Sequence, residues 1–138
     1  MTSTAALVDT GFLVALFARS DKHHQSAREF LAQAGGIQLH SIWPVVAEAC
    51  FFLDANGKSA LLKWLERGTM VMHDIVLADL PAVRKTLEKY RNLDPDFTDA
   101  ALVTLAGSLG ITGIITVDCR DFSAYRIGNG QSFRRLWL

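Results

Sequence analysis

Three aspartates crowd the start of one apolar segment of the sequence. Asp94, Asp96 and Asp99 lie within six positions in the stretch NLDPDFTDAALVTLAG, although the whole chain has only 14 acidic residues. The apolar run that follows predicts a helix from about Pro95 to Leu109, closed by Gly110. Carboxylates near a helix start either accept hydrogen bonds from free backbone N–H groups or serve a chemical purpose such as metal binding. The segment alone leaves both interpretations open.

Two further carboxylates end predicted strands, and a third lies inside an apolar helix. The run ALVD ends on Asp9 and the run IITVD ends on Asp118. In an open parallel α/β sheet, ligands bind at the carboxyl ends of the strands. Glu48 lies within the apolar stretch WPVVAEACFFL, where a carboxylate is costly to bury unless a positive group meets it. The alternatives are that Asp9 and Asp118 only form turns and that Glu48 reaches the surface.

Carboxylates gathered at one edge of a sheet would repel one another at neutral pH. A divalent cation such as Mg²⁺ or Mn²⁺ removes this repulsion, because it prefers oxygen ligands and accepts water in its remaining positions. A cation held in this way activates water and stabilises charge on a phosphoryl group. The pattern therefore predicts phosphodiester hydrolysis.

Short apolar runs alternate with amphipathic segments along the whole chain. The predicted strands cover residues 5–8, 37–41, 69–75 and 111–117, with a last short strand near 133–138. Continuously apolar strands that alternate with helices are typical of a three-layer α/β/α sandwich around a mainly parallel sheet. No linker-like segment divides the chain, so we expect one domain over residues 1–138.

The helix boundaries follow from capping residues, prolines and glycines. Ser20 or Asp21 is expected to cap a helix that ends at residues 35–36. A helix with Pro44 in its first turn is expected to end just before Gly57. Further helices are predicted at 12–17, 58–67, 80–91 and 95–109, and Asp94 is expected to cap the last of these. Residues 119–138 are expected to be mostly irregular.

Composition narrows the class of protein without naming a partner. The 138 residues carry 14 basic and 14 acidic side chains, and half of them are hydrophobic. This is the composition of a globular protein rather than a disordered one. Cys50 and Cys119 form no disulfide framework, and the amino terminus has no signal-peptide pattern, so we expect a cytoplasmic protein. No apolar run reaches about 18 residues, which argues against a membrane span.

The motifs, taken in order, resemble those of the PIN-domain family, and specifically the VapC-like toxin ribonucleases. The resemblance rests on LVDTGFLVALFARSDKHH, WPVVAEACFFL, DPDFTDAALVTLAGSLGI and IITVDCRDF, which extend over nearly the whole chain. It implies a parallel sheet between helical layers and an acidic pocket that binds Mg²⁺ or Mn²⁺. By motif position the four family acids are Asp9, Glu48, Asp99 and Asp118, with Asp9, Asp99 and Asp118 as the metal ligands.

The resemblance also implies supporting residues and partners. Thr10 and Thr116 match hydroxyl positions beside the first and fourth acids, and Asp96 matches an additional aspartate near the pocket. A basic residue often follows the fourth acid in this family, whereas here Cys119 does, which leaves Arg120 as the phosphate-facing candidate. An RNA substrate, a small antitoxin protein and a homodimer are the expected partners.

The acidic residues and the family resemblance are compatible with three functions. The leading hypothesis is a metal-dependent endoribonuclease, the toxin of a type II toxin–antitoxin pair. A second is a Mg²⁺-dependent phosphatase-type domain with Asp9 as nucleophile, but Gly11 stands where such enzymes usually place a second acid. A third is a PIN fold that only binds RNA or protein. The four histidines show no catalytic spacing.

Overall fold

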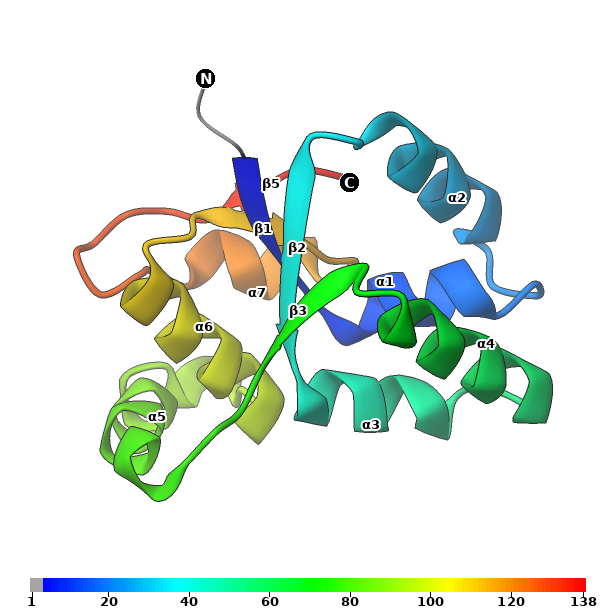
Figure 1. The fold of residues 1–138 in the computed structure, drawn as a ribbon. Coiled ribbons are helices and arrows are strands. Elements are labelled where there is room, and N and C mark those ends of the chain that lie inside the picture. Colours follow the sequence, from blue (N-terminus) through cyan, green and yellow to red (C-terminus); the bar gives the residue numbers. More distant parts are fainter. Residues whose placement is uncertain (1–3) are drawn as a thin grey trace.

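A five-stranded parallel sheet forms the centre of the molecule (Figure 1). The structure is a computed structural model, and it describes residues 4–138. The strand order is β3-β2-β1-β4-β5, and every neighbouring pair is parallel. The strands are β1 (Thr4–Val8), β2 (Ile37–Ile42), β3 (Met70–His73), β4 (Gly113–Ile115) and β5 (Arg134–Arg135).

Helices cover both faces of the sheet and make the predicted three-layer α/β/α sandwich. The first group comprises α1 (Thr10–Phe17), α2 (His24–Gln33), α3 (Trp43–Phe51) and α4 (Ala55–Glu66). The second comprises α5 (Leu80–Lys89), α6 (Phe97–Leu109) and α7 (Cys119–Ala124), with short 3₁₀ turns at Leu77–Asp79 and Arg91–Leu93. Figure 1 shows the two groups on opposite sides of the strands. Right-handed crossovers explain this division, because the chain moves outward from β1 to β3 and returns to the other side of β1 for β4.

Strand β1 lies in the middle of the sheet, and its last three residues are fully buried. Ala6, Leu7 and Val8 have no exposed surface, and Leu7 pairs with His40 of β2 and Ile114 of β4. A strand covered on both faces must be apolar throughout, which explains the uninterrupted run before Asp9. The fold therefore fixes the end of β1 firmly, and with it the position of the residue that follows.

Several element boundaries differ from those predicted. The helix expected to end before Gly57 ends at Phe51, and Gly57 lies in the first turn of α4, where its N–H donates to Asp54 Oδ1 at 2.7 Å. The α2 helix begins at His24, beyond its predicted cap, although Asp21 Oδ1 still accepts from His23 N. Residues 119–124, expected to be irregular, form α7, which Asp118 caps. Strands β4 and β5 are shorter than predicted.

Across residues 4–138, none of the helices combines the length and the apolar character that crossing a bilayer requires.

Gly113 provides a test of how tightly the central strands pack. A Cβ atom added there would lie 2.9 Å from the backbone oxygen of Ala5 and 3.0 Å from Leu136 Cδ1. Because backbone cannot move aside cheaply, we expect Gly113→Ala to lower the free energy of unfolding by about 1–3 kcal/mol in a denaturant titration. Gly35→Ala is the matched control, since nothing lies within 4 Å of the added carbon. Equal stability of the two variants would contradict this packing.

Candidate active site

The candidate site lies where the direction of the chain across the sheet reverses. Strands β1 and β4 are neighbours, but the chain leaves β1 toward β2 and leaves β4 toward β5. The connections therefore diverge and leave a crevice at the carboxyl ends of these two strands. Asp9 follows β1, and Asp118 follows β4 after two intervening residues. Both aspartates predicted from strand ends are thus placed at the same crevice.

Asp9 is held in place by three hydrogen bonds. Its N–H donates to Ile115 O at 3.0 Å, while its carboxylate accepts from Thr10 N and from Thr116 Oγ1, each at 2.8 Å. The side chain is only 7% exposed. Burial raises the pKa of Asp9 from 3.8 to about 6, against the opposing effect of these hydrogen bonds. Thr116, which the resemblance places beside the acids, thus contacts Asp9 directly.

The same threonine joins Asp9 to the acids of the next loop. Asp118 N donates to Thr116 Oγ1 at 2.9 Å, and Asp118 Oδ1 accepts from Asp121 N at 3.1 Å. Asp118 therefore caps α7, and Asp121 lies in the first turn of that helix. Burial and the nearby charge of Asp121 raise the pKa of Asp118 above its ordinary value.

The three aspartates at the start of α6 divide into separate structural roles. Asp96, rather than Asp94, caps the helix, because Asp96 Oδ1 accepts from Asp99 N at 2.8 Å. The prediction that Asp94 is the cap is wrong. Asp94 is exposed and has a left-handed backbone, with φ of 47°, which turns the chain before Pro95. Asp99 lies in the first helical turn and faces the acids of the other loops.

Three carboxylates approach one another closely in this crevice. One oxygen atom from each of Asp99, Asp118 and Asp121 lies within 4.8 Å of those of the other two. Burial, followed by the charges of Asp9, Asp96, Asp118 and Asp121, raises the pKa of Asp99 to about 8. Among residues 4–138 this is the group of side chains best placed to hold a metal ion. Asp9 lies close enough to raise the pKa of Asp99, but it is outside this group of three.

Glu48 is held by two hydroxyl groups rather than by a positive charge. Thr10 Oγ1 donates to one of its oxygens at 2.9 Å, and Thr98 Oγ1 donates to the other at 2.8 Å. These bonds join α3 to the starts of α1 and α6. Thr10 was expected beside Asp9; its N–H does contact Asp9, while its hydroxyl group contacts Glu48. Glu48 thus ties together the elements that carry Asp9 and Asp99.

A family model for the PIN domain matches residues 6–127 of the chain. The chain belongs to the PIN domain family. The ribonuclease VapC26 of Mycobacterium tuberculosis is 28% identical over 130 residues, a match that covers 91% of this chain and 96% of that protein. The family predicted from the order of the motifs is therefore confirmed.

Two solved structures have the same fold. VapC20 of Mycobacterium tuberculosis, described as a Sarcin-Ricin loop cleaving toxin, superimposes with a TM-score of 0.77 at 18% identity, over 86% of this chain and 94% of its own. The DNA-bound VapBC from Salmonella typhimurium gives a TM-score of 0.61 at 16% identity, over 98% of this chain and 99% of its own. At these identities the structures establish the fold alone.

The residues of this PIN domain that the sequence did not single out are Asp121, Thr98 and Tyr125. Asp121 comes three residues after Asp118, and this spacing would have placed both acids on one helix face if α7 had been foreseen. Thr98 lies directly before Asp99, but its contact with Glu48 joins residues 50 positions apart. Arg120 is exposed in α7, one residue from Asp121, and no hydrogen bond fixes it among the described residues. Its role stays a prediction.

Tyr125 adds a buried polar group beside the acids. It has no exposed surface, and its hydroxyl is the one buried side-chain oxygen or nitrogen without a hydrogen-bond partner in residues 4–138. Burial and the charge of Asp99 raise the pKa of Tyr125 well above its usual value, so it remains a donor. The crevice thus offers a set of hard oxygen ligands together with a neighbouring O–H group. This donor set fits Mg²⁺ or Mn²⁺ better than a soft transition metal.

The raised pKa values predict how stability depends on pH without metal. The folded state holds protons on Asp9 and Asp99 up to pH values of about 6 and about 8, whereas an ordinary aspartate loses its proton near 3.8. The folded state therefore binds more protons in this range, and its stability falls as pH rises through it. In EDTA, we expect the melting temperature to fall between about pH 6 and about pH 8 and Asp99→Asn to flatten that fall. A wild-type melting temperature that rises over this interval would contradict the assignment.

Proposed function

We propose that this PIN domain is a metal-dependent endoribonuclease that hydrolyses RNA phosphodiester bonds, and that it is the toxin of a type II toxin–antitoxin pair. One observation carries the chemical part of the proposal. The carboxylates of Asp99, Asp118 and Asp121 converge within 4.8 Å at the crevice between β1 and β4, although like charges disfavour such an approach. The similarity of this chain to the ribonuclease VapC26 over most of both chains supports RNA as the substrate.

Asp99 and Asp118 hold the cation in this proposal, as the sequence predicted, and Asp121 joins them. Asp9 lies beside this group and contributes a ligand directly or through water, because Thr10 N and Thr116 Oγ1 fix its carboxylate at the edge of the crevice. When bound, Mg²⁺ or Mn²⁺ lowers the pKa of coordinated water and stabilises negative charge on the phosphate. The hydrogen bonds to Thr116 keep the first and fourth acids at a fixed separation.

The remaining predicted residues position the ligands and the substrate. Glu48 completes the pocket and orients α1 and α6 through Thr10 and Thr98. Asp96 fixes the first turn of α6, and so Asp99, by accepting from Asp99 N. Arg120, exposed beside Asp121, contacts a phosphate of the RNA.

A phosphatase with Asp9 as nucleophile fits the geometry poorly. Both oxygens of Asp9 already accept hydrogen bonds, and only 7% of the side chain is exposed, which leaves little access for an incoming phosphorus atom. A PIN fold that only binds RNA or protein does not account for the close approach of three carboxylates, whereas a bound cation does. Cleavage of RNA is therefore the function that the site supports best.

The proposed partner is a small antitoxin protein, and the proposed assembly is a homodimer in the cytoplasm. Phe51 and Phe52, at the end of α3, are 89% and 68% exposed, and they follow Glu48 by only a few residues. Exposed aromatic side chains of this kind commonly mark protein interfaces. The VapBC structure of Salmonella typhimurium, whose PIN-type fold matches this chain, supports a partner of the antitoxin class.

Cleavage of RNA by matched aspartate variants tests the function. We expect Asp99→Asn to lower the cleavage rate with Mg²⁺ or Mn²⁺ at least about 100-fold, because it removes a charged ligand from the cation site. Asp94→Asn is the control, since Asp94 is exposed and has the left-handed backbone that Asn also tolerates. EDTA is expected to abolish cleavage by the wild-type protein.

Two results of the same assay would overturn the proposal. Equal cleavage by the wild type, Asp99→Asn and EDTA-treated samples would show that the acids hold no catalytic metal. Absence of cleavage by the wild type on every class of RNA offered, with bound RNA detected, would favour a binding module instead.

A further inference from the structure

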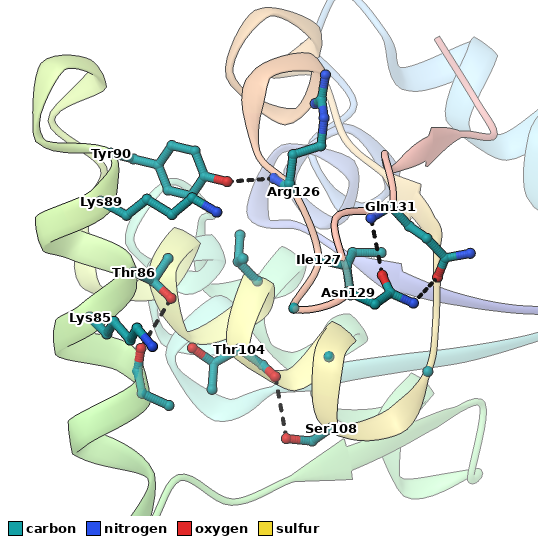
Figure 2. Close-up of a pocket in the computed structure, with 15 residues that line it drawn as sticks. Lys85, Thr86, Lys89, Tyr90, Thr104, Ser108, Arg126, Ile127, Asn129 and Gln131 are labelled. Atoms are coloured by element: carbon teal, nitrogen blue, oxygen red, sulfur yellow. Dashed lines mark hydrogen bonds between the residues drawn. The ribbon is translucent and has the colours of Figure 1, made fainter.

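A hollow separate from the acid crevice lies on the α5–α6 face of the sheet (Figure 2). It has a volume of about 510 Å³, within the range of ordinary ligand-binding pockets. Its walls are α5, the second half of α6 and the segment 126–131. None of the four family acids lines it, so it is distinct from the cation site.

The charged groups at this hollow are cationic. Lys85 and Lys89 lie one turn apart on α5, and Figure 2 shows both side chains reaching from that helix toward the hollow. The described residues that line the hollow include neither Asp nor Glu. Arg126 turns away from it, and its Nη1 donates to the carbonyl groups of residues 123–125. Two ammonium groups without a carboxylate between them are suited to a phosphate.

The other residues that line the hollow favour a ligand with an apolar ring and hydrogen-bond donor groups. Val103 and Ile127 are buried apolar residues of the lining, and Ile127 points inward in Figure 2. Three hydroxyl-bearing residues also line the hollow, and each hydroxyl donates its proton to a carbonyl of its own helix. These are Thr86, Thr104 and Ser108. Their oxygens therefore have lone pairs left to accept from a ligand, as the N–H and O–H groups of a nucleotide would require.

The hollow is aligned with the acid crevice along one face of α6. Asp99, Val103 and Gly107 are spaced by four residues, so they lie one above another on the helix. The distance along the helix axis from Asp99 to Gly107 is about 12 Å. On the other wall, Tyr90 packs against Tyr125 with ring centroids 5.1 Å apart, and Tyr125 lies beside the acids. Val103 is only 5% exposed and the Tyr90 hydroxyl accepts from Arg126 N at 2.7 Å, so an RNA strand at the acids would reach the hollow over the surface of these residues rather than along α6 itself.

We propose that this hollow binds a nucleotide of the RNA substrate a short distance from the cleaved bond. Its phosphate lies between Lys85 and Lys89, and its base lies over Val103 and Ile127. The inference rests on the proposed ribonuclease function, because it takes RNA to be the ligand of the neighbouring crevice. A free mononucleotide has the same chemistry, and binding of adenosine monophosphate distinguishes the two sources.

Binding of a short fluorescent single-stranded RNA, measured in EDTA so that it stays intact, tests the charge of the site. Lys85→Ala/Lys89→Ala is expected to bind roughly tenfold more weakly, because two charged contacts to phosphate are lost. The slope of log affinity against log salt should shrink by about 0.7, the value for one neutralised phosphate on a single strand. Lys58→Ala/Lys63→Ala makes the same charge change on α4, at the opposite face of the sheet, and should have neither effect.

A second pair of variants tests the shape of the site without changing its charge. A Cβ atom at Gly107 would meet Gly128 N at 3.6 Å and Ile127 Cγ2 at 3.9 Å, which are ordinary contacts. Gly107→Ala should therefore bind RNA like the wild type. Gly107→Leu extends an apolar side chain into the hollow, so it should weaken binding several-fold and leave the salt slope unchanged.

The outcomes separate this inference from the function on which it rests. Equal affinities for the two lysine pairs, with RNA bound by the wild type, would overturn the inference while leaving the ribonuclease proposal intact. Unchanged RNA binding combined with adenosine monophosphate binding that is lost in Lys85→Ala/Lys89→Ala would assign the hollow to a free nucleotide and overturn the RNA assignment. A wild-type protein that binds no RNA in EDTA would overturn the inference, while cleavage of RNA with Mg²⁺ or Mn²⁺ decides the ribonuclease proposal separately.

Discussion

Repulsion among carboxylates at the crevice between β1 and β4 is the constraint on which the rest of the site depends. Asp9, Asp99, Asp118 and Asp121 would separate if their backbones allowed it, and the pKa values of the first three are raised by burial first and by the neighbouring carboxylates second. The packing of the sheet holds these acids in place. Its central strand β1 is fully buried from Ala6 to Val8, so Asp9 cannot retreat without disturbing the core. A cation at this crevice converts a destabilising arrangement into a binding site.

Hydroxyl groups, rather than positive side chains, organise these acids. Thr116 contacts Asp9 and the backbone of Asp118, while Thr10 and Thr98 hold the two oxygens of Glu48. A lysine or arginine in these places would neutralise the carboxylates and compete with a metal ion. Hydroxyl donors fix the positions of the carboxylates and leave their negative charge available. Two positive groups, Lys85 and Lys89, border the hollow further along α6.

The position of a side chain could be predicted from the sequence where the residue type and its neighbours determine the local structure. A buried strand that ends on Asp9 or Asp118 places that side chain at the carboxyl edge, and the family resemblance adds the order of the motifs. Sequence could not separate Asp94 from Asp96 as the helix cap, because both precede the same apolar run and only the backbone turn at Asp94 decides between them. It also could not foresee α7, since six residues are too few for a periodic pattern, and so Asp121 was missed. The contact of Thr98 with Glu48 depends on tertiary packing alone.

The central claim is that the acids at this crevice form a cation site. Anomalous diffraction from crystals of the protein grown or soaked with Mn²⁺ tests it most directly. We expect a peak among the carboxylates of Asp99, Asp118 and Asp121, with Asp9 alongside. A crystal with Mn²⁺ bound only at other positions, or with no peak at this crevice at saturating Mn²⁺, would contradict it.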